Sequence, residues 1–154
     1  MTKTLIEALR GRGWTVTAAE SCTGGMVAAA ITDVAGSSEV FERGFVTYSN
    51  AAKREMLGVK ATTLDAHGAV SEEVAAEMAQ GALAAAGADV AVAISGIAGP
   101  GGSDHKPEGR VCFALATKSD VTAKTVEFGA IGRAKVRSKA TDYALTLILS
   151  AAQA

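Results

Sequence analysis

The sequence predicts an α/β fold, a three-layer α/β/α sandwich around a mixed, mostly parallel sheet of about five strands. Segments with a strand pattern alternate along the chain with segments that have the spacing of amphipathic helices, as they do in α/β domains. The segment Ala88–Ile94 is apolar on both faces, which is typical of a central strand covered by helices on two sides. Two loops rich in glycine and hydroxyl residues, Ala19–Gly25 and Ser95–Gly102, each follow an apolar run. Open α/β sheets place their ligand sites in such loops.

The first half of the chain contains three predicted helices and two predicted strands. A short helix over Thr4–Arg10 carries its apolar residues on one face and ends at Gly11. The elements predicted after it are a strand at Trp14–Ala19, a helix at Gly24–Val34, a strand at Phe41–Tyr48 and a helix at Asn50–Leu57.

The second half begins with a helix that Ser71 caps and Gly87 ends. Its first turn carries two glutamates, where the helix dipole favours acids. The central strand Ala88–Ile94 follows, and the longest irregular stretch, Gly96–Gly109, comes next; a loop of that length in a compact domain is usually functional. The remaining predicted elements are an antiparallel hairpin of Arg110–Thr117 with Val121–Phe128 and a closing amphipathic helix at Arg133–Ala151.

Composition limits the function classes. Fifteen Lys and Arg residues nearly balance 16 Asp and Glu residues, so the chain lacks the charge excess of proteins that bind nucleic acid or anionic lipid directly. The two cysteines are far apart in the sequence, which fits a reducing cytosol and gives no metal-ligand spacing. The N-terminus has no signal-peptide pattern, and no apolar run reaches the roughly 20 residues of a membrane helix. We therefore expect one cytoplasmic domain over residues 1–154, with no metal and no membrane partner.

Ser21 is the first candidate for chemistry. An acid, a thiol, a hydroxyl and two glycines surround it, which suits a nucleophile presented at the start of a helix better than core packing. Two alternatives remain open from the residues alone. Ser21 can instead be the N-cap of the following helix. Cys22 is a rival nucleophile, because a helix N-terminus lowers the pKa of a thiol, although no histidine accompanies it.

The segment around Ser21 is also the first of several by which the chain resembles the C-terminal domain of the competence/damage-inducible protein CinA. Five segments carry the resemblance, in the order and spacing of that family: AESCTGG at 19–25, GFVTYSN at 44–50 followed by Lys53 and Leu57–Val59, HGAVS at 67–71, SGIAGP at 95–100 and KPEG at 106–109. One departure is Arg110, where the family more often has a small polar residue.

The resemblance implies nicotinamide-nucleotide amidohydrolase activity. Nicotinamide mononucleotide would be converted to nicotinic acid mononucleotide and ammonia, without a cofactor, as a step of pyridine nucleotide recycling. Longer family members carry a molybdopterin-binding-like domain before this one, so the chain resembles the stand-alone deamidase. We also expect a homo-oligomer, a dimer or larger.

By the same resemblance, Ser21 is the catalytic serine and Lys53 is its candidate base. A lysine can act as a base only where burial or a nearby cation lowers its pKa. Tyr48 and Ser38 occupy matching family positions and would relay or orient the proton. Without the resemblance, Lys53 would be read as a solvated surface residue, Tyr48 as a strand-end residue and Ser38 as a turn residue.

The other candidates would bind substrate. Arg133 and Arg137 are one helical turn apart and would clamp the nucleotide phosphate, although two solvated arginines are a serious alternative. Glu20 would orient Lys53 or a backbone amide. The remaining candidates are possible oxyanion donors and a nest of amides for phosphate or ribose: Thr23, Gly24 and Gly25 in the first loop, and Ser95, Gly96 and Gly99 in the second.

Two other function classes compete with the amidohydrolase. A non-catalytic nucleotide-binding module would use the same glycine loops and arginines without needing Ser21 and Lys53 together, so the presence of both favours the enzyme. A protein-partner role in competence or the DNA-damage response is the third class.

Overall fold

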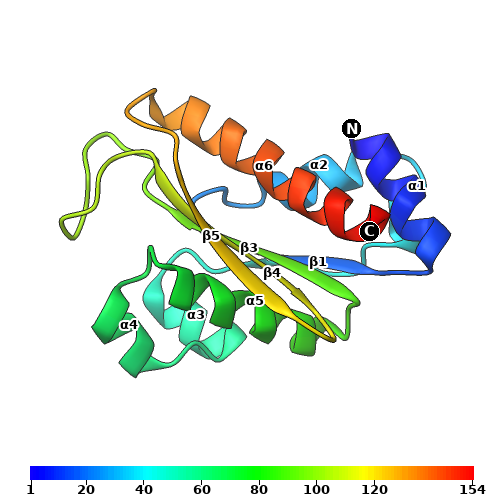
Figure 1. Cartoon of the computed structure of the whole chain (residues 1–154), viewed down its shortest axis with the longest axis horizontal. Coiled ribbons are helices and arrows are strands. Elements are labelled where there is room, and N and C mark those ends of the chain that lie inside the picture. Colours follow the sequence, from blue (N-terminus) through cyan, green and yellow to red (C-terminus); the bar gives the residue numbers. More distant parts are fainter.

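The computed structural model describes residues 1–154 and contains one five-stranded sheet with helices on both faces (Figure 1). One face is covered by α1 (Thr2–Arg12), α2 (Met26–Thr32) and α6 (Arg133–Gln153). The opposite face is covered by α3 (Asn50–Leu57), α4 (Ala61–His67) and α5 (Glu72–Ala86). None of these helices combines the length and apolar character needed to span a membrane.

The sheet is mixed, and four of its five strands run in one direction. The strands are β1 (Val16–Glu20), β2 (Phe45–Val46), β3 (Val90–Gly96), β4 (Arg110–Thr117) and β5 (Val121–Glu127). Their order is β2-β1-β3-β4-β5, with β1 parallel to both its neighbours and β4 antiparallel to β3 and β5. The predicted fold class and the predicted hairpin are confirmed.

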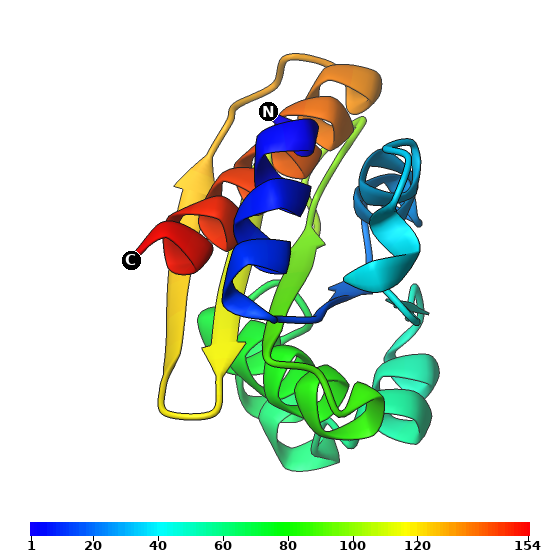
Figure 2. The ribbon, with the colours of Figure 1, turned by 90° about the vertical axis from the view of Figure 1, so that its right-hand side faces the viewer.

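The connections that leave strand β1 and strand β2 run in opposite directions across the sheet. After β1 the chain passes through α2 to β2 on one side, and after β2 it passes through α3, α4 and α5 to β3 on the other side. Figure 2, which is turned by 90°, shows these two groups of helices on opposite faces. The carboxyl ends of β1 and β3 therefore flank a topological switch point, the usual ligand position in open α/β sheets.

The two faces of β3 pack differently. Val90, Val92 and Ile94 lie in the core beneath α1, α2 and α6, whereas Ala91 and Ala93 lie in the core beneath α5. The α5 face is dominated by alanine, and small side chains permit the helix to approach the sheet closely. The expectation of a strand that is apolar on both faces is confirmed.

The predicted strand at Phe41–Tyr48 is too long. Only Phe45 and Val46 pair with β1, and Phe41 makes an isolated bridge to Val16. Between them, the Arg43 carbonyl accepts a hydrogen bond from the Thr17 side chain at 2.7 Å, so a side chain takes the place of a strand partner. An edge segment has one neighbouring strand to hold it extended, and here that pairing is interrupted.

Other helices also differ from the sequence prediction. Helix α1 continues through Gly11, where the prediction ended it, and is capped by Gly13. Helix α2 begins at Met26 instead of Gly24, because Gly24 and Gly25 have positive φ angles of 55° and 108° and form the turn before it. Helix α4 was not predicted. It has seven residues and a single buried side chain, Leu64, so its sequence lacks a periodic apolar face.

A glycine inside α5 fixes the position of α3. A Cβ atom at Gly81 would lie 1.9 Å from the carbonyl oxygen of Leu57, the last residue of α3. The close approach of the two helices therefore requires glycine at this position. Because α3 carries Lys53, the contact also sets where that side chain enters the protein.

We predict opposite effects of the same substitution at two helical glycines. Gly81→Ala should lower the free energy of unfolding by about 1–3 kcal/mol, because the new methyl group collides with backbone. Gly11→Ala in α1 is the matched control, since nothing lies within 4 Å of its Cβ position, and it should raise stability by about 0.5–1 kcal/mol. Denaturant unfolding measures both. Equal stability of Gly81→Ala and the unsubstituted protein would contradict the close contact between α3 and α5.

Candidate active site

A cavity of about 340 Å³ lies beyond the carboxyl ends of β1 and β3. Its walls come from the loop after β1, from the start of α3, from residues 69 and 70, from the glycine-rich loop after β3 and from Arg133 at the start of α6. The cavity is of the size that proteins use for small ligands. The structure thus brings together residues from five regions that the sequence singled out.

Ser21 directly follows β1 and is held by the sheet. Its backbone N–H donates to the Ile94 carbonyl at 2.9 Å, which extends the β1–β3 pairing by one residue. Its side chain lines the cavity and makes no cap to α2. Of the two roles left open by the sequence, N-cap and nucleophile, the geometry is compatible with the second.

Glu20 performs the capping instead. Its buried carboxylate accepts from the Thr23 hydroxyl at 2.6 Å and from the backbone N–H groups of Val27 and Ala28, at 2.9 and 3.0 Å, in the first turn of α2. The Gly25 N–H also donates to it, at 3.2 Å. Of the two partners expected for Glu20, it binds backbone amides and not Lys53.

Lys53 is buried, with 1% of its surface exposed, and its amine lies in the cavity wall. Nζ is 3.0 Å from Ser21 Oγ, and it donates to the carbonyl oxygens of Thr47 and Tyr48 at 2.9 and 3.4 Å. Burial lowers the pKa of Lys53 below its usual value of 10.5. Removal of the ammonium from water therefore favours the neutral amine, which is the form that can accept a proton.

The pKa of Cys22 is shifted in the opposite direction. Burial raises the pKa of its thiol to about 11, so the group stays protonated at neutral pH. A thiol that does not ionise is a weak nucleophile. The structure therefore favours Ser21 over Cys22.

The two arginines of α6 have different roles. Arg133 lines the cavity and donates to the Gly99 carbonyl at 2.7 Å and to the Tyr48 hydroxyl at 2.9 Å. Arg137 is absent from the cavity wall and donates to the carbonyls of Cys22 and Thr23, at 3.0 and 3.4 Å. These contacts explain why cations stand at a helix N-terminus, where the dipole disfavours them.

Several candidates lie outside the cavity. Ser38 is exposed in a short 3₁₀ helix, Ser37–Glu39, and is not part of the cavity wall. Thr23 and Gly25 donate to Glu20, and Gly24 N–H donates to the Ser21 carbonyl, so the expected oxyanion donors hold the loop together. Ser95, Gly96 and Gly99 do line the cavity.

Two residues have contacts that the sequence did not suggest. Lys106 lines the cavity and donates to the carbonyls of His67 and Val70; its place in the KPEG segment was the only available signal. Arg110 is paired with Glu127 on the neighbouring strand at 2.6 Å and is not part of the cavity wall. No group of three or more His, Cys, Asp or Glu side chains is arranged to hold a metal ion.

Comparison with known proteins places the chain in a family. It is 61% identical over 140 residues to the nicotinamide-nucleotide amidohydrolase PncC of Escherichia coli (strain K12), covering 90% of this chain and 85% of that protein. The PncC protein of Enterobacter agglomerans is 59% identical over 145 residues, covering 92% and 87%. The crystal structure of a CinA superfamily protein from Klebsiella pneumoniae 700603 matches with a TM-score of 0.95 and 41% identity, covering 99% of this chain and 95% of that one. The family model of the CinA C-terminal domain matches residues 1–152, and the chain belongs to that family.

Proposed function

We propose that the protein hydrolyses the carboxamide of nicotinamide mononucleotide to nicotinic acid mononucleotide and ammonia, with Ser21 as nucleophile and Lys53 as its base. The observation that carries the proposal is the 3.0 Å separation between Ser21 Oγ and the buried Lys53 Nζ at the wall of the cavity. The names of the two PncC relatives support the substrate.

The hydrogen-bond partners of Lys53 suit a neutral amine. A neutral –NH₂ group has two N–H donors and one lone pair. The carbonyls of Thr47 and Tyr48 take the two donors, and the lone pair is left for the Ser21 hydroxyl proton. A nucleophile and a base within hydrogen-bond reach are the arrangement that activated serines use.

In the proposed reaction, Lys53 takes the Ser21 proton as Oγ bonds to the carboxamide carbon. The resulting ammonium returns a proton to the departing nitrogen, the C–N bond breaks and ammonia leaves. Water then attacks the acyl-serine ester as Lys53 accepts one of its protons. The bond between the acyl carbon and Ser21 Oγ breaks, the Lys53 ammonium returns the proton to Oγ, and nicotinic acid mononucleotide leaves. The backbone N–H groups of Cys22 and Gly96, which lie with Ser21 in the cavity wall, are the proposed donors to the oxyanion.

Arg133 is the proposed partner of the substrate phosphate. It is the one arginine in the cavity wall, and its guanidinium is already oriented by Gly99 and Tyr48. A planar cation held in this way suits recognition of a phosphate. Tyr48 then acts by positioning Arg133, and its carbonyl by positioning Lys53.

Substitution of the two neighbouring candidates distinguishes the nucleophile. Ser21→Ala should lower ammonia release from nicotinamide mononucleotide by at least about 10³-fold, because no other hydroxyl lies beside Lys53 Nζ. Cys22→Ala should keep most of the activity, because its thiol is protonated and buried. A coupled ammonia assay on both purified variants measures the difference. Near-normal turnover of Ser21→Ala together with loss in Cys22→Ala would reverse the assignment.

Substitution of Lys53 tests its role as base. Lys53→Ala and Lys53→Arg should both lower kcat by about 10²–10⁴-fold, because arginine keeps the charge but does not give up its proton. In the unsubstituted protein, kcat should fall as the pH drops through the lowered pKa of Lys53, since only the neutral amine accepts a proton, and should be constant above it. Circular dichroism of both variants controls for folding. Turnover of Lys53→Arg close to that of the unsubstituted protein would make Lys53 a binding residue.

A further inference from the structure

We propose that Lys106 is a latch that holds the glycine-rich loop against the opposite wall of the cavity and so controls how tightly substrate is bound. The latch joins the loop at 99–109 to the linker His67–Val70 between α4 and α5. The kinetic part of this inference rests on the proposed function, whereas the structural part does not.

The contacts of the Lys106 ammonium define the latch. Nζ donates to the carbonyls of His67 and Val70, each at 2.6 Å, across 39 and 36 residues of sequence. Gly68 lies between these two acceptors with a positive φ of 76°, and a Cβ there would be only 3.1 Å from Nζ. The linker is therefore shaped to receive an ammonium group.

The linker side of the contact is anchored independently of Lys106. The Ser71 hydroxyl donates to the Gly68 carbonyl, and the Ser95 hydroxyl donates to the Ala69 carbonyl, both at 2.8 Å. All four consecutive carbonyls of His67–Val70 thus accept from side chains, and two of these bonds do not involve the loop tip. Loss of Lys106 would leave the linker in place.

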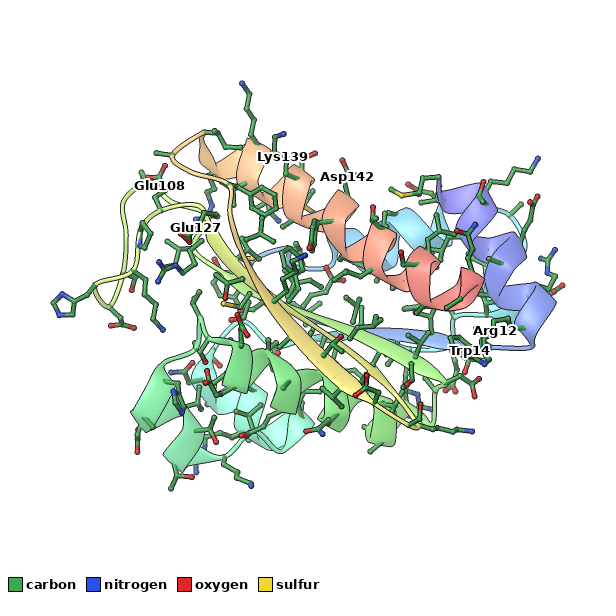
Figure 3. The ribbon with its side chains drawn as sticks, in the orientation of Figure 1. Arg12, Trp14, Glu108, Glu127, Lys139 and Asp142 are labelled. Atoms are coloured by element: carbon green, nitrogen blue, oxygen red, sulfur yellow. The ribbon has the colours of Figure 1, made fainter.

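Arg133 donates to the Gly99 carbonyl at the start of the loop, but the loop tip, residues 100–107, has no comparable anchor. Ser103 and Lys106 exchange two backbone hydrogen bonds around Asp104 and His105, and Glu108 accepts from the Gly101 N–H, so these bonds lie within the loop. The two bonds of Lys106 are the only side-chain hydrogen bonds that join residues 100–107 to another element. Figure 1 shows that this loop projects beyond the end of the sheet, and in Figure 3 Glu108 lies where it returns toward β4.

The latch has a direct consequence for binding. Residues 99–104 of the loop form one wall of the cavity, so a loop that swings away removes that wall. Affinity falls in proportion to the fraction of molecules in the binding-competent state. Ser21 and Lys53 lie on other elements, so movement of the loop should change kcat, the rate once substrate is bound, less than it changes KM.

The test compares Lys106→Met with Lys139→Met. Methionine keeps an unbranched stem but has no donor, and Lys139 is an exposed lysine on α6, away from the cavity (Figure 3). Hydrogen exchange should become faster in the peptide that covers residues 101–106 of Lys106→Met and stay unchanged in the peptide that covers β3. With nicotinamide mononucleotide, KM should rise about tenfold or more, and kcat should change by less than about threefold. Lys106→Arg keeps N–H donors, so its KM should lie between that of Lys106→Met and that of the unsubstituted protein.

Unchanged exchange in Lys106→Met would overturn the latch, and so would a fall in kcat with KM unchanged, which would place Lys106 in the chemical step. Equal effects of Lys139→Met would overturn it as well. If the unsubstituted protein releases no ammonia from nicotinamide mononucleotide, the proposed function fails, and the exchange measurement still decides the latch.

Discussion

The site depends on the burial of one amine. Lys53 Nζ has almost no contact with water, so the fold must supply acceptors for its N–H groups. Those acceptors are carbonyls of Thr47 and Tyr48, which lie just beyond the two-residue strand β2 and take no part in the sheet. A longer edge strand would direct these carbonyls toward a neighbouring strand. The glycine contact between α5 and α3 then completes the position of Lys53 relative to Ser21.

The loop after β1 is held by two opposite charges. Glu20 accepts from its N–H groups and the Thr23 hydroxyl, and Arg137 donates to its carbonyls. Both side chains satisfy backbone groups that a tight turn leaves without partners. Residues that the sequence suggested as substrate ligands therefore act indirectly, because they hold the loop that carries Ser21. A nucleophile held in this way requires little reorganisation when substrate arrives.

Local patterns predicted the elements that local forces decide. Helix Asn50–Leu57 and strand Arg110–Thr117 have the predicted bounds, because an N-cap with a C-terminal glycine defines the helix and a continuous apolar run defines the strand. The edge strand was overpredicted, since its pairing depends on a distant neighbour. The contacts of Arg137 and Lys106 were not predicted either, because their partners are 114 and 39 residues away in sequence. The motifs indicated which residues belong near the site, but only the fold separates those that line the cavity from those that support its walls.

One physical cause gives the adjacent residues of this site opposite chemistry. Removal of a group from water disfavours its charged form, whatever the sign of the charge. For Lys53 the disfavoured form is the ammonium, so burial produces a base. For Cys22 the disfavoured form is the thiolate, so the same burial produces an inert side chain. The environment that gives Ser21 a neutral lysine as its base therefore also keeps the neighbouring Cys22 thiol protonated. Burial alone, without a charged partner, favours the serine over the cysteine as nucleophile.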